Sequence, residues 1–352
     1  ALSGVVPFQR SCEKTAVSVA PGDGQHHHLR QRAGGDETFA APLEVKSPDG
    51  RLALALEIKD SGEARSCPVY RISWQGRTIL ADSRLGLELK DGPLGEGMRL
   101  VRKTTREQDN TWKPVCGERS EIRDHFNELT VVLQESQAPK RQLTVTFRVF
   151  NEGVGLAYTV PEQPGLDRVR ISAERTEFRF AGNHPAWATY KGQGVYQQIP
   201  LSRIEPGCER PLVIEMDDDL CVALAEARLV DYARMKFAPL AGASHALVSQ
   251  LDGAVEGPTP LTSPWRVVMV AESPGRLLEN NVIVSNLNDP CAIADTSWIK
   301  PGKVIREGTL TTDGGKRCVD FAVRRGLRYV EYDAGWYGPE NDPTSDAREV
   351  NV

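Results

Sequence analysis

Short runs of alternating apolar and polar residues dominate the chain from residue 43 onward, and turn sequences separate them. At 52–58, leucine or isoleucine occupies every second position, which is the period of a half-buried strand. Ser-Pro-Asp-Gly at 47–50 precedes this run and favours a tight turn, because proline fixes φ while Asp and Gly accept positive φ. The pattern predicts that the chain enters a β-sheet just after this turn.

The same pattern recurs over the next two hundred or so residues. A Gln-Gly turn joins two predicted strands within 70–80. Further strands are predicted at 129–133, 143–150, 156–160, 176–180, 211–215, 220–225, 246–251 and 265–271. Many short strands with turns between them favour a large antiparallel β-sandwich over residues 43–275.

The pattern changes near residue 276. A polar Asn-Leu-Asn-Asp-Pro sequence at 286–290 indicates a linker, placed at 276–296. A strand at 303–305, a helix at 314–325 ended by Gly326, and a strand at 327–332 then follow. This order opens a parallel α/β unit, and a complete (β/α)8 barrel takes about 250 residues. Residues 297–352 are therefore expected to be the incomplete start of a barrel.

Composition narrows the class of protein. The 352 residues carry a net charge of −5, with 40% hydrophobic and 26% charged residues, which are ordinary globular values. No run of about 18 uncharged apolar residues exists, so no membrane span is predicted. The mild acidity argues against a nucleic-acid partner, which needs a clustered basic surface.

The cysteines and the N-terminal stretch offer little chemistry. Seven cysteines are widely spread without a C-x-x-C pair, which favours free structural thiols, with one or two disulfides as the alternative for an exported protein. Residues 1–42 have no period and are expected to be a disordered leader; the adjacent histidines at 26–28 lack the spacing of a closed metal site. No signal peptide is visible in the sequence. The protein is nevertheless expected to be periplasmic or extracellular.

A series of segments in fixed order carries a family resemblance. They include Phe-Arg-Val-Phe-Asn-Glu-Gly-Val-Gly at 147–155 and Tyr-Asp-Ala-Gly-Trp at 332–336. The others lie at 47–50, 83–89, 112–115, 121–129, 226–232, 263–266, 286–290 and 297–303. Together they resemble glycoside hydrolase family 97, the α-glucosidase and α-galactosidase group. The resemblance implies a mainly β fold: an N-terminal super-sandwich similar to galactose mutarotase, followed by a catalytic (β/α)8 barrel.

The resemblance also implies a reaction. Cleavage of a glycosidic bond uses two carboxylates, one as acid and the other as base or nucleophile. In the family, inverting members use glutamates and retaining members an aspartate nucleophile, on later barrel strands. These catalytic residues are therefore expected beyond Val352, so that the complete form would hydrolyse α-linked glucosides or galactosides while this fragment would be inactive alone. The alternative is a non-catalytic carbohydrate-binding or scaffolding sandwich.

Two residues are candidates for contacting an α-linked oligosaccharide. Asp333 and Trp336 follow the second predicted barrel strand, at the end where barrel enzymes build their sites. Trp336 is expected to stack on a sugar ring and Asp333 to accept sugar hydroxyls; the alternative is that Asp333 caps a turn and Trp336 packs the rim. Glu331 alternates with Tyr332 and Asp333 along the predicted strand, so it is expected to point into the barrel. The alternative is that Glu331 forms a buried structural ion pair.

A calcium ligand is the remaining expectation. The resemblance implies a Ca²⁺ site to which a sandwich glutamate contributes, and the matching position here is Gln193. Because Ca²⁺ accepts amide oxygens, Gln193 is a candidate ligand with reduced affinity; the alternative is a surface polar loop. Glu226 and Asp231, in another matching segment, are expected to pair or cap structurally.

Overall fold

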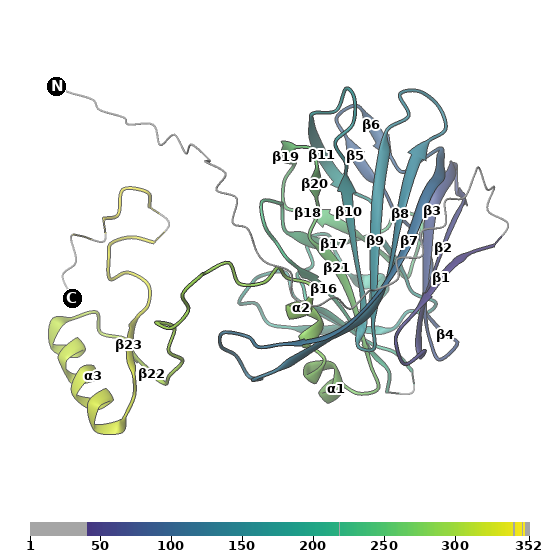
Figure 1. Cartoon of the computed structure of the whole chain (residues 1–352). Helices are drawn as coiled ribbons and strands as arrows, with labels where there is room; N and C mark the ends of the chain where they lie inside the picture. Colours follow the sequence, from purple (N-terminus) through teal and green to yellow (C-terminus); the bar gives the residue numbers. More distant parts are fainter. Residues whose placement is uncertain (1–40, 218, 341, 347, 349–352) are drawn as a thin grey trace, which may run out of the picture. The chain divides into compact units, whose positions relative to one another are not determined.

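The computed structural model describes residues 41–217, 219–340, 342–346 and 348, and most of the regular structure in them is β. The chain runs through strands as far as β21 and then turns to helices (Figure 1). The predicted leader at 1–42 and its histidines lie outside the described residues, apart from residues 41 and 42. The expectation of a mainly β sandwich is confirmed.

The largest sheet has ten antiparallel strands in the order β14-β13-β15-β16-β21-β10-β9-β8-β7, with β20 paired to β10. These strands are β7 (Met98–Trp112), β8 (Ile122–Glu135), β9 (Gln142–Phe150), β10 (Gly153–Val160), β13 (Pro185–Ala188), β14 (Gln197–Pro200), β15 (Leu212–Glu215), β16 (Cys221–Ala227), β20 (Leu261–Thr262) and β21 (Trp265–Ala271). A short 3-10 helix, Leu201–Arg203, follows β14.

Three smaller antiparallel sheets complete the sandwich. One consists of β1 (Leu43–Lys46), β2 (Leu52–Ser61), β3 (Ala64–Trp74) and β4 (Arg77–Arg84), and another of β5 (Leu87–Leu89), β6 (Gly92–Leu94), β11 (Arg168–Glu174) and β19 (Val255–Pro258). The third consists of β12 (Glu177–Arg179), β17 (Met235–Pro239) and β18 (Ala246–Leu251). One contiguous apolar core draws its side chains from all four sheets.

The alternation of side chains explains how the large sheet is covered on both faces. In β16, Val222 and Leu224 point into the main core, whereas Ala223 and Ala225 belong to a second apolar cluster on the opposite face. Every residue of β21 is buried for the same reason. Small residues on the second face leave room for helices to pack closely.

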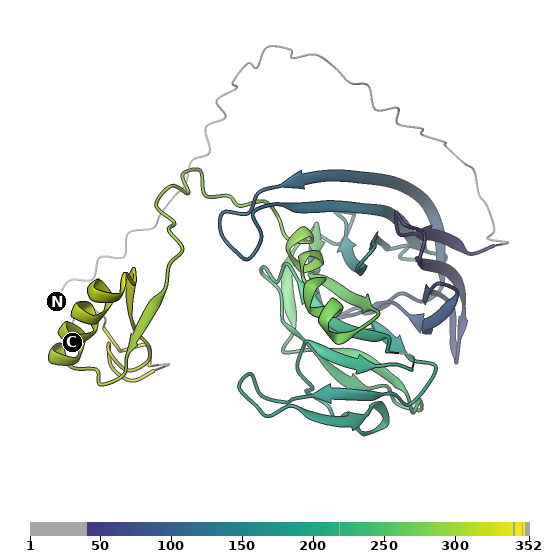
Figure 2. The ribbon, with the colours of Figure 1, turned by 90° about the horizontal axis from the view of Figure 1, so that it is seen from below.

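Two short helices, α1 (Pro274–Glu279) and α2 (Val282–Asn286), cover that second face (Figure 2). The Ser273 side chain caps α1 by accepting a hydrogen bond from the Arg276 backbone N–H at 3.2 Å. Part of the stretch predicted as a linker, 276–296, is thus helical and packed. Three buried apolar side chains hold it against the sheet: Leu277, Ile283 and Leu287.

The turn joining β7 and β8 reaches over these helices. Trp112 donates its indole N–H to Asn286 Oδ1 at 2.8 Å, and Asn286 Nδ2 donates to the Arg123 carbonyl at 2.9 Å. Arg119 donates to the Glu279 carbonyl at 2.6 Å. The two helices are therefore tied to the sandwich by hydrogen bonds as well as by apolar contact.

The C-terminal unit consists of β22 (Val304–Glu307), α3 (Thr312–Arg325) and β23 (Tyr329–Tyr332). β22 and β23 are parallel, with Ile305 opposite Val330, as the predicted strand–helix–strand order requires. The Thr311 side chain accepts from the Gly314 N–H at 3.0 Å, and Gly326 ends α3 with φ of 65°, as predicted.

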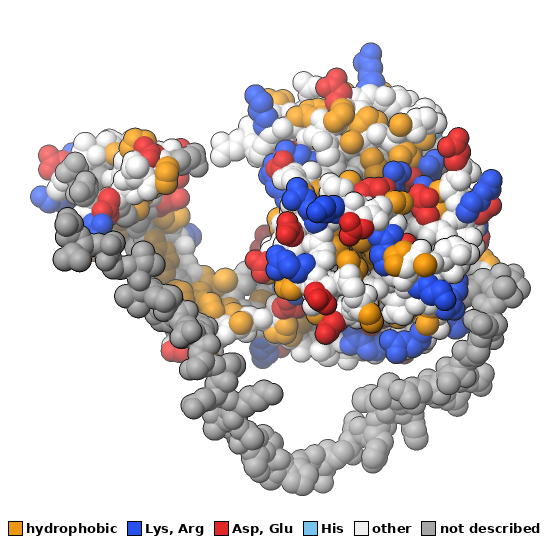
Figure 3. Space-filling view, turned by 90° about the horizontal axis from the view of Figure 1, so that it is seen from above, with side chains coloured by type: hydrophobic (Ala, Val, Ile, Leu, Met, Phe, Trp, Pro, Cys, Tyr) orange, Lys and Arg blue, Asp and Glu red, His pale blue; other side chains and the backbone are white. Residues whose placement is uncertain are grey.

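Other expectations concern cysteines, membranes and charge. Among the described residues, Cys67, Cys116, Cys208, Cys221, Cys291 and Cys318 are free thiols, and burial raises the pKa of Cys208 to about 11. No helix in the described part of the chain is long and apolar enough to cross a bilayer. Figure 3 shows acidic and basic side chains interspersed over the visible face of the sandwich.

Candidate functional site

The position of α3 decides which face of the β22–β23 pair is open. A Cβ on Gly314 would lie 2.3 Å from Glu307 Oε1, and one on Gly315 would lie 2.0 Å from the Tyr332 hydroxyl. Two adjacent glycines thus let α3 pack directly on the strand face that carries Glu307 and Tyr332. Because side chains alternate, Arg306, Glu331 and Asp333 belong to the opposite face, which α3 does not cover.

Asp333 lies at the C-terminal end of β23, as predicted. Its Oδ2 is 2.5 Å from Arg306 Nη2, and both side chains are more than half exposed. Arg306 therefore orients the carboxylate without burying it, and no partner of Oδ1 occurs among the described residues. Such a carboxylate can accept hydrogen bonds from hydroxyl groups of a ligand.

Trp336 lines an open hollow of about 630 Å³ that runs along the β22–β23 pair. Val304, Tyr329 and Glu331 line the hollow as well, and Tyr337 packs edge-on against the indole with a centroid distance of 5.2 Å. Asp333 is not part of this lining. Asp333 thus follows the end of β23 directly, whereas Trp336 lies over the hollow along the strand pair.

Glu331 and Arg306 refine the sequence interpretation. Glu331 is exposed, opposite Arg306 in the strand register, and the ion pair of Arg306 is with Asp333. No ion pair of Glu331 occurs among the described residues, so its inward orientation and the alternative of a buried ion pair both stay predictions. Arg306 was not predicted as a site residue; its signal was its place two residues after a strand begins, on the same face as Asp333.

Gln193 lies apart from any cluster of metal ligands. It is exposed in the turn that follows Lys191. No group of three or more His, Cys, Asp or Glu side chains with suitable spacing occurs among the described residues. The residues described do not by themselves fit a calcium site, because one amide oxygen is far from the six to eight oxygens that Ca²⁺ takes.

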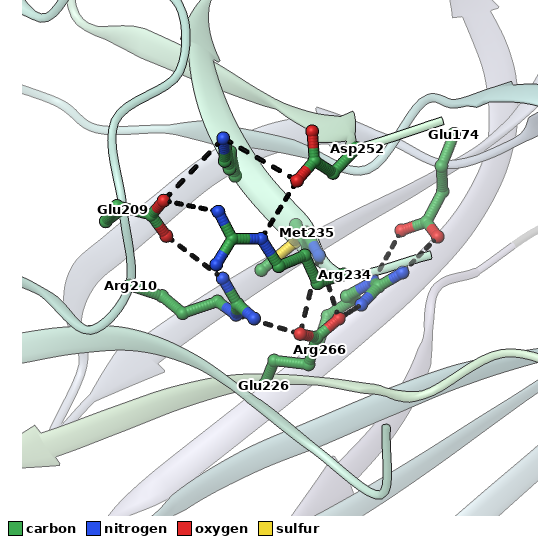
Figure 4. A network of polar contacts seen from close by, with 9 residues as sticks. Glu174, Glu209, Arg210, Glu226, Arg234, Met235, Asp252 and Arg266 are labelled. Atoms are coloured by element: carbon green, nitrogen blue, oxygen red, sulfur yellow. Dashed lines mark hydrogen bonds and ion pairs between the residues drawn. The ribbon is translucent and has the colours of Figure 1, made fainter. Parts of the chain in front are cut away.

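The second cluster of charge lies within the sandwich and centres on Arg266 of β21 (Figure 4). The Arg266 side chain is completely buried and binds Glu174 through two hydrogen bonds, of 2.7 Å and 2.6 Å. Its third contact is an ion pair with Glu226. Burial alone would lower the pKa of Arg266, but the two carboxylates outweigh burial and hold this pKa above its usual value.

Glu226 has no oxygen free for a ligand. Besides Arg266, it accepts from Arg210 Nε at 2.8 Å and from the Met235 backbone N–H at 3.1 Å. The prediction that Glu226 pairs structurally is confirmed. Asp231 is exposed in a bend with φ of 49°, and no hydrogen bond or ion pair of its side chain occurs among the described residues.

The network continues from Glu226 towards the surface. The Glu209 carboxylate accepts a hydrogen bond from Arg210 at 3.2 Å and one from Arg234 at 2.7 Å. Arg234 also donates a hydrogen bond to Asp252 at 3.0 Å (Figure 4). These contacts join four strands, β11, β16, β17 and β21, which come from three sheets. The network therefore has a structural role, in that it links three sheets, and it is not a substrate site.

Comparison with known proteins agrees with this architecture. The family profile described as "Glycosyl-hydrolase 97 N-terminal" matches residues 45–290, more than half of the chain. A retaining alpha-galactosidase of Bacteroides thetaiotaomicron is 26% identical over 347 aligned positions, covering 83% of this chain and 50% of that protein. A probable retaining alpha-galactosidase of Streptomyces bingchenggensis is 24% identical, covering 85% and 47%.

Solved structures give the same result. A glycoside hydrolase family 97 enzyme from Pseudoalteromonas sp. strain K8, solved with panose and with acarbose, superposes with a TM-score of 0.76 and 29% identity, covering 84% of this chain and 48% of that one. This chain thus spans about half the length of the relatives it matches. From residue 45 to residue 290 it has both the sequence profile and the fold of one family, and it belongs to glycoside hydrolase family 97.

Proposed function

We propose that this chain is part of an α-glycosidase that hydrolyses α-linked glucosides or galactosides. The observation that carries the proposal is the order of two units: a family 97 sandwich, then a parallel βαβ unit whose uncovered strand ends carry Asp333 and Trp336. Active sites of β/α barrels lie at the C-terminal ends of their strands. If the barrel continues beyond these strands, its active site would therefore lie at the strand end that carries Asp333.

The substrate class rests on relatives. The two curated ones are named as alpha-galactosidases, and the Pseudoalteromonas enzyme was solved with panose and acarbose. Within the proposed site, Trp336 offers an aromatic face to a sugar ring and Asp333 accepts hydroxyl protons while Arg306 holds it in place. The two carboxylates that cleave the bond are proposed to lie on further barrel strands.

The experiment is an assay of the protein expressed from the whole reading frame to which these residues belong. We expect it to release p-nitrophenol from the α-galactoside, the α-glucoside or both. Trp336→Ala should raise KM about tenfold with a smaller change in kcat, because it removes ring contact and no reacting group. Trp336→Phe should keep most of the affinity, and Val323→Ala, on the exposed surface of α3, serves as control. A folded enzyme without turnover on either substrate would contradict the proposal.

We propose that the complete protein binds Ca²⁺ at a site to which Gln193 contributes only one of the ligands. Gln193 would supply one neutral oxygen, and carboxylates from elsewhere in the complete protein would supply the charge. Gln193→Glu should then tighten calcium binding of the complete protein about tenfold, measured by isothermal titration, since a carboxylate replaces a dipole. Gln197→Glu, on the neighbouring strand β14, is the matched control, and equal affinities in both variants would remove Gln193 from the site.

A further inference from the structure

A second aromatic surface lies on the sandwich, at the β13–β15 end of the large sheet and beside the first residue of α1. In β13, Trp187 lies directly opposite Gln198 of β14 on one side and Val213 of β15 on the other. Residues in register share a face, so these three side chains form a row across the sheet. Tyr196 and Glu215, each two residues from a member of the row, extend the same face.

Hydrogen bonds fix the orientation of the Trp187 ring. Its indole N–H donates to Glu215 Oε1 at 2.7 Å, and Gln198 Nε2 donates to Glu215 Oε2 at 2.9 Å. Glu215 forms no ion pair with Lys or Arg among the described residues. The carboxylate therefore has no cationic partner in the described part of the chain, and each oxygen retains capacity to accept another hydrogen bond.

The surface is hollowed and mostly apolar. A depression of about 390 Å³ is lined by Trp187, Tyr196, Pro211, Val213, Glu215 and Pro274. Trp187 is 39% exposed and Tyr196 is 47% exposed, which is unusual for large rings. Two accessible rings, one of them hydrogen-bonded to a carboxylate, suit the binding of a ligand.

We propose that this surface, the Trp187 face, binds a pyranose ring of an oligosaccharide. One side of a pyranose presents aliphatic C–H groups, which match the indole and phenol rings, while its hydroxyls project sideways as donors. Glu215 lies where such a hydroxyl would donate, and a hydrogen bond to an ionised acceptor is stronger than one to a neutral group. All the lining residues named here belong to the sandwich and its first helix, so binding at the Trp187 face can be measured separately from hydrolysis.

The test is titration of the 352-residue chain with maltotriose and with melibiose, followed by tryptophan fluorescence and calorimetry. We expect binding of at least one sugar, weakened about tenfold or more by Trp187→Ala and severalfold by Glu215→Gln. Trp187→Phe keeps a ring and should retain most of the affinity, which guards against a folding defect. Trp298→Ala, which removes another exposed tryptophan, is the matched control.

Three results would overturn the proposal: no sugar binding by the folded chain, equal binding by Trp187→Ala, or binding lost only in Trp336→Ala. Choline is titrated in parallel, because rings beside a carboxylate also suit a quaternary ammonium group. Choline binding in place of sugar binding would likewise reject a saccharide site. Sugar binding at Trp187 in a full-length protein without turnover would reject only the proposed hydrolase.

Discussion

Arg266→Met is expected to lower the free energy of unfolding by about 3–5 kcal/mol, the range for breaking a buried ion pair from one side. The substitution keeps an unbranched side chain but leaves Glu174 and Glu226 without the cation that both of them contact. Both carboxylates are almost completely buried, so water cannot replace the guanidinium. Urea unfolding followed by circular dichroism at pH 7 measures the loss.

A matched control separates burial from charge. Arg276→Met removes an arginine paired with Glu279 on the surface of α1, where the side chain is 72% exposed, and should change stability by less than about 0.5 kcal/mol. Adding Glu174→Gln and Glu226→Gln to Arg266→Met should recover part of the loss, because no uncompensated charge remains. Equal stability of Arg266→Met and wild type would show that the network is dispensable.

Gly153→Ala should destabilise the sandwich by about 3 kcal/mol, the upper part of the range for overpacking. A Cβ at this position would lie 2.4 Å from the Val268 carbonyl oxygen and 2.9 Å from Met269 Cα. Both are backbone atoms of β21, and Met269 is the register partner of Gly153, so β10 and β21 would have to separate. The midpoint of thermal or urea unfolding reports the effect.

Gly275→Ala is the control for this prediction. No heavy atom lies within 4 Å of a Cβ at Gly275, which lies in the first turn of α1. Alanine there should be neutral or stabilise by a few tenths of a kcal/mol, because it limits the unfolded chain without a clash. A loss in Gly275→Ala as large as that in Gly153→Ala would show that close approach is not the cause.

Local pattern was sufficient for strands with one buried face. The alternation at 52–58 and the apolar run at 265–271 became β2 and β21, and the helix ended by Gly326 became α3. The local pattern did not predict β7, a 15-residue strand whose sequence has no alternation of apolar residues. β7 is the edge of the large sheet and is exposed along most of its length, so its charged residues face water and carry no period.

The polar sites depended on contacts that sequence does not report. Arg266 and Glu174 are 92 residues apart, and only the pairing of sheets brings them together. A lone arginine in the apolar strand Trp-Arg-Val-Val-Met-Val-Ala was the available signal that a buried acid must exist. Asp333 followed from its strand end, whereas Arg306 and the row through Trp187 required the register between strands.

The attachment of α1 and α2 bears on where this protein can be divided. A recombinant version shortened after residue 275 would uncover a continuous apolar surface that includes Phe126, Trp265 and Met269, and it would remove the acceptors of Trp112 and Arg119. Exposed surfaces of this kind promote aggregation. A cut after residue 290, where the family profile also ends, would leave the helices in place and is expected to yield a monodisperse sandwich suited to sugar titration.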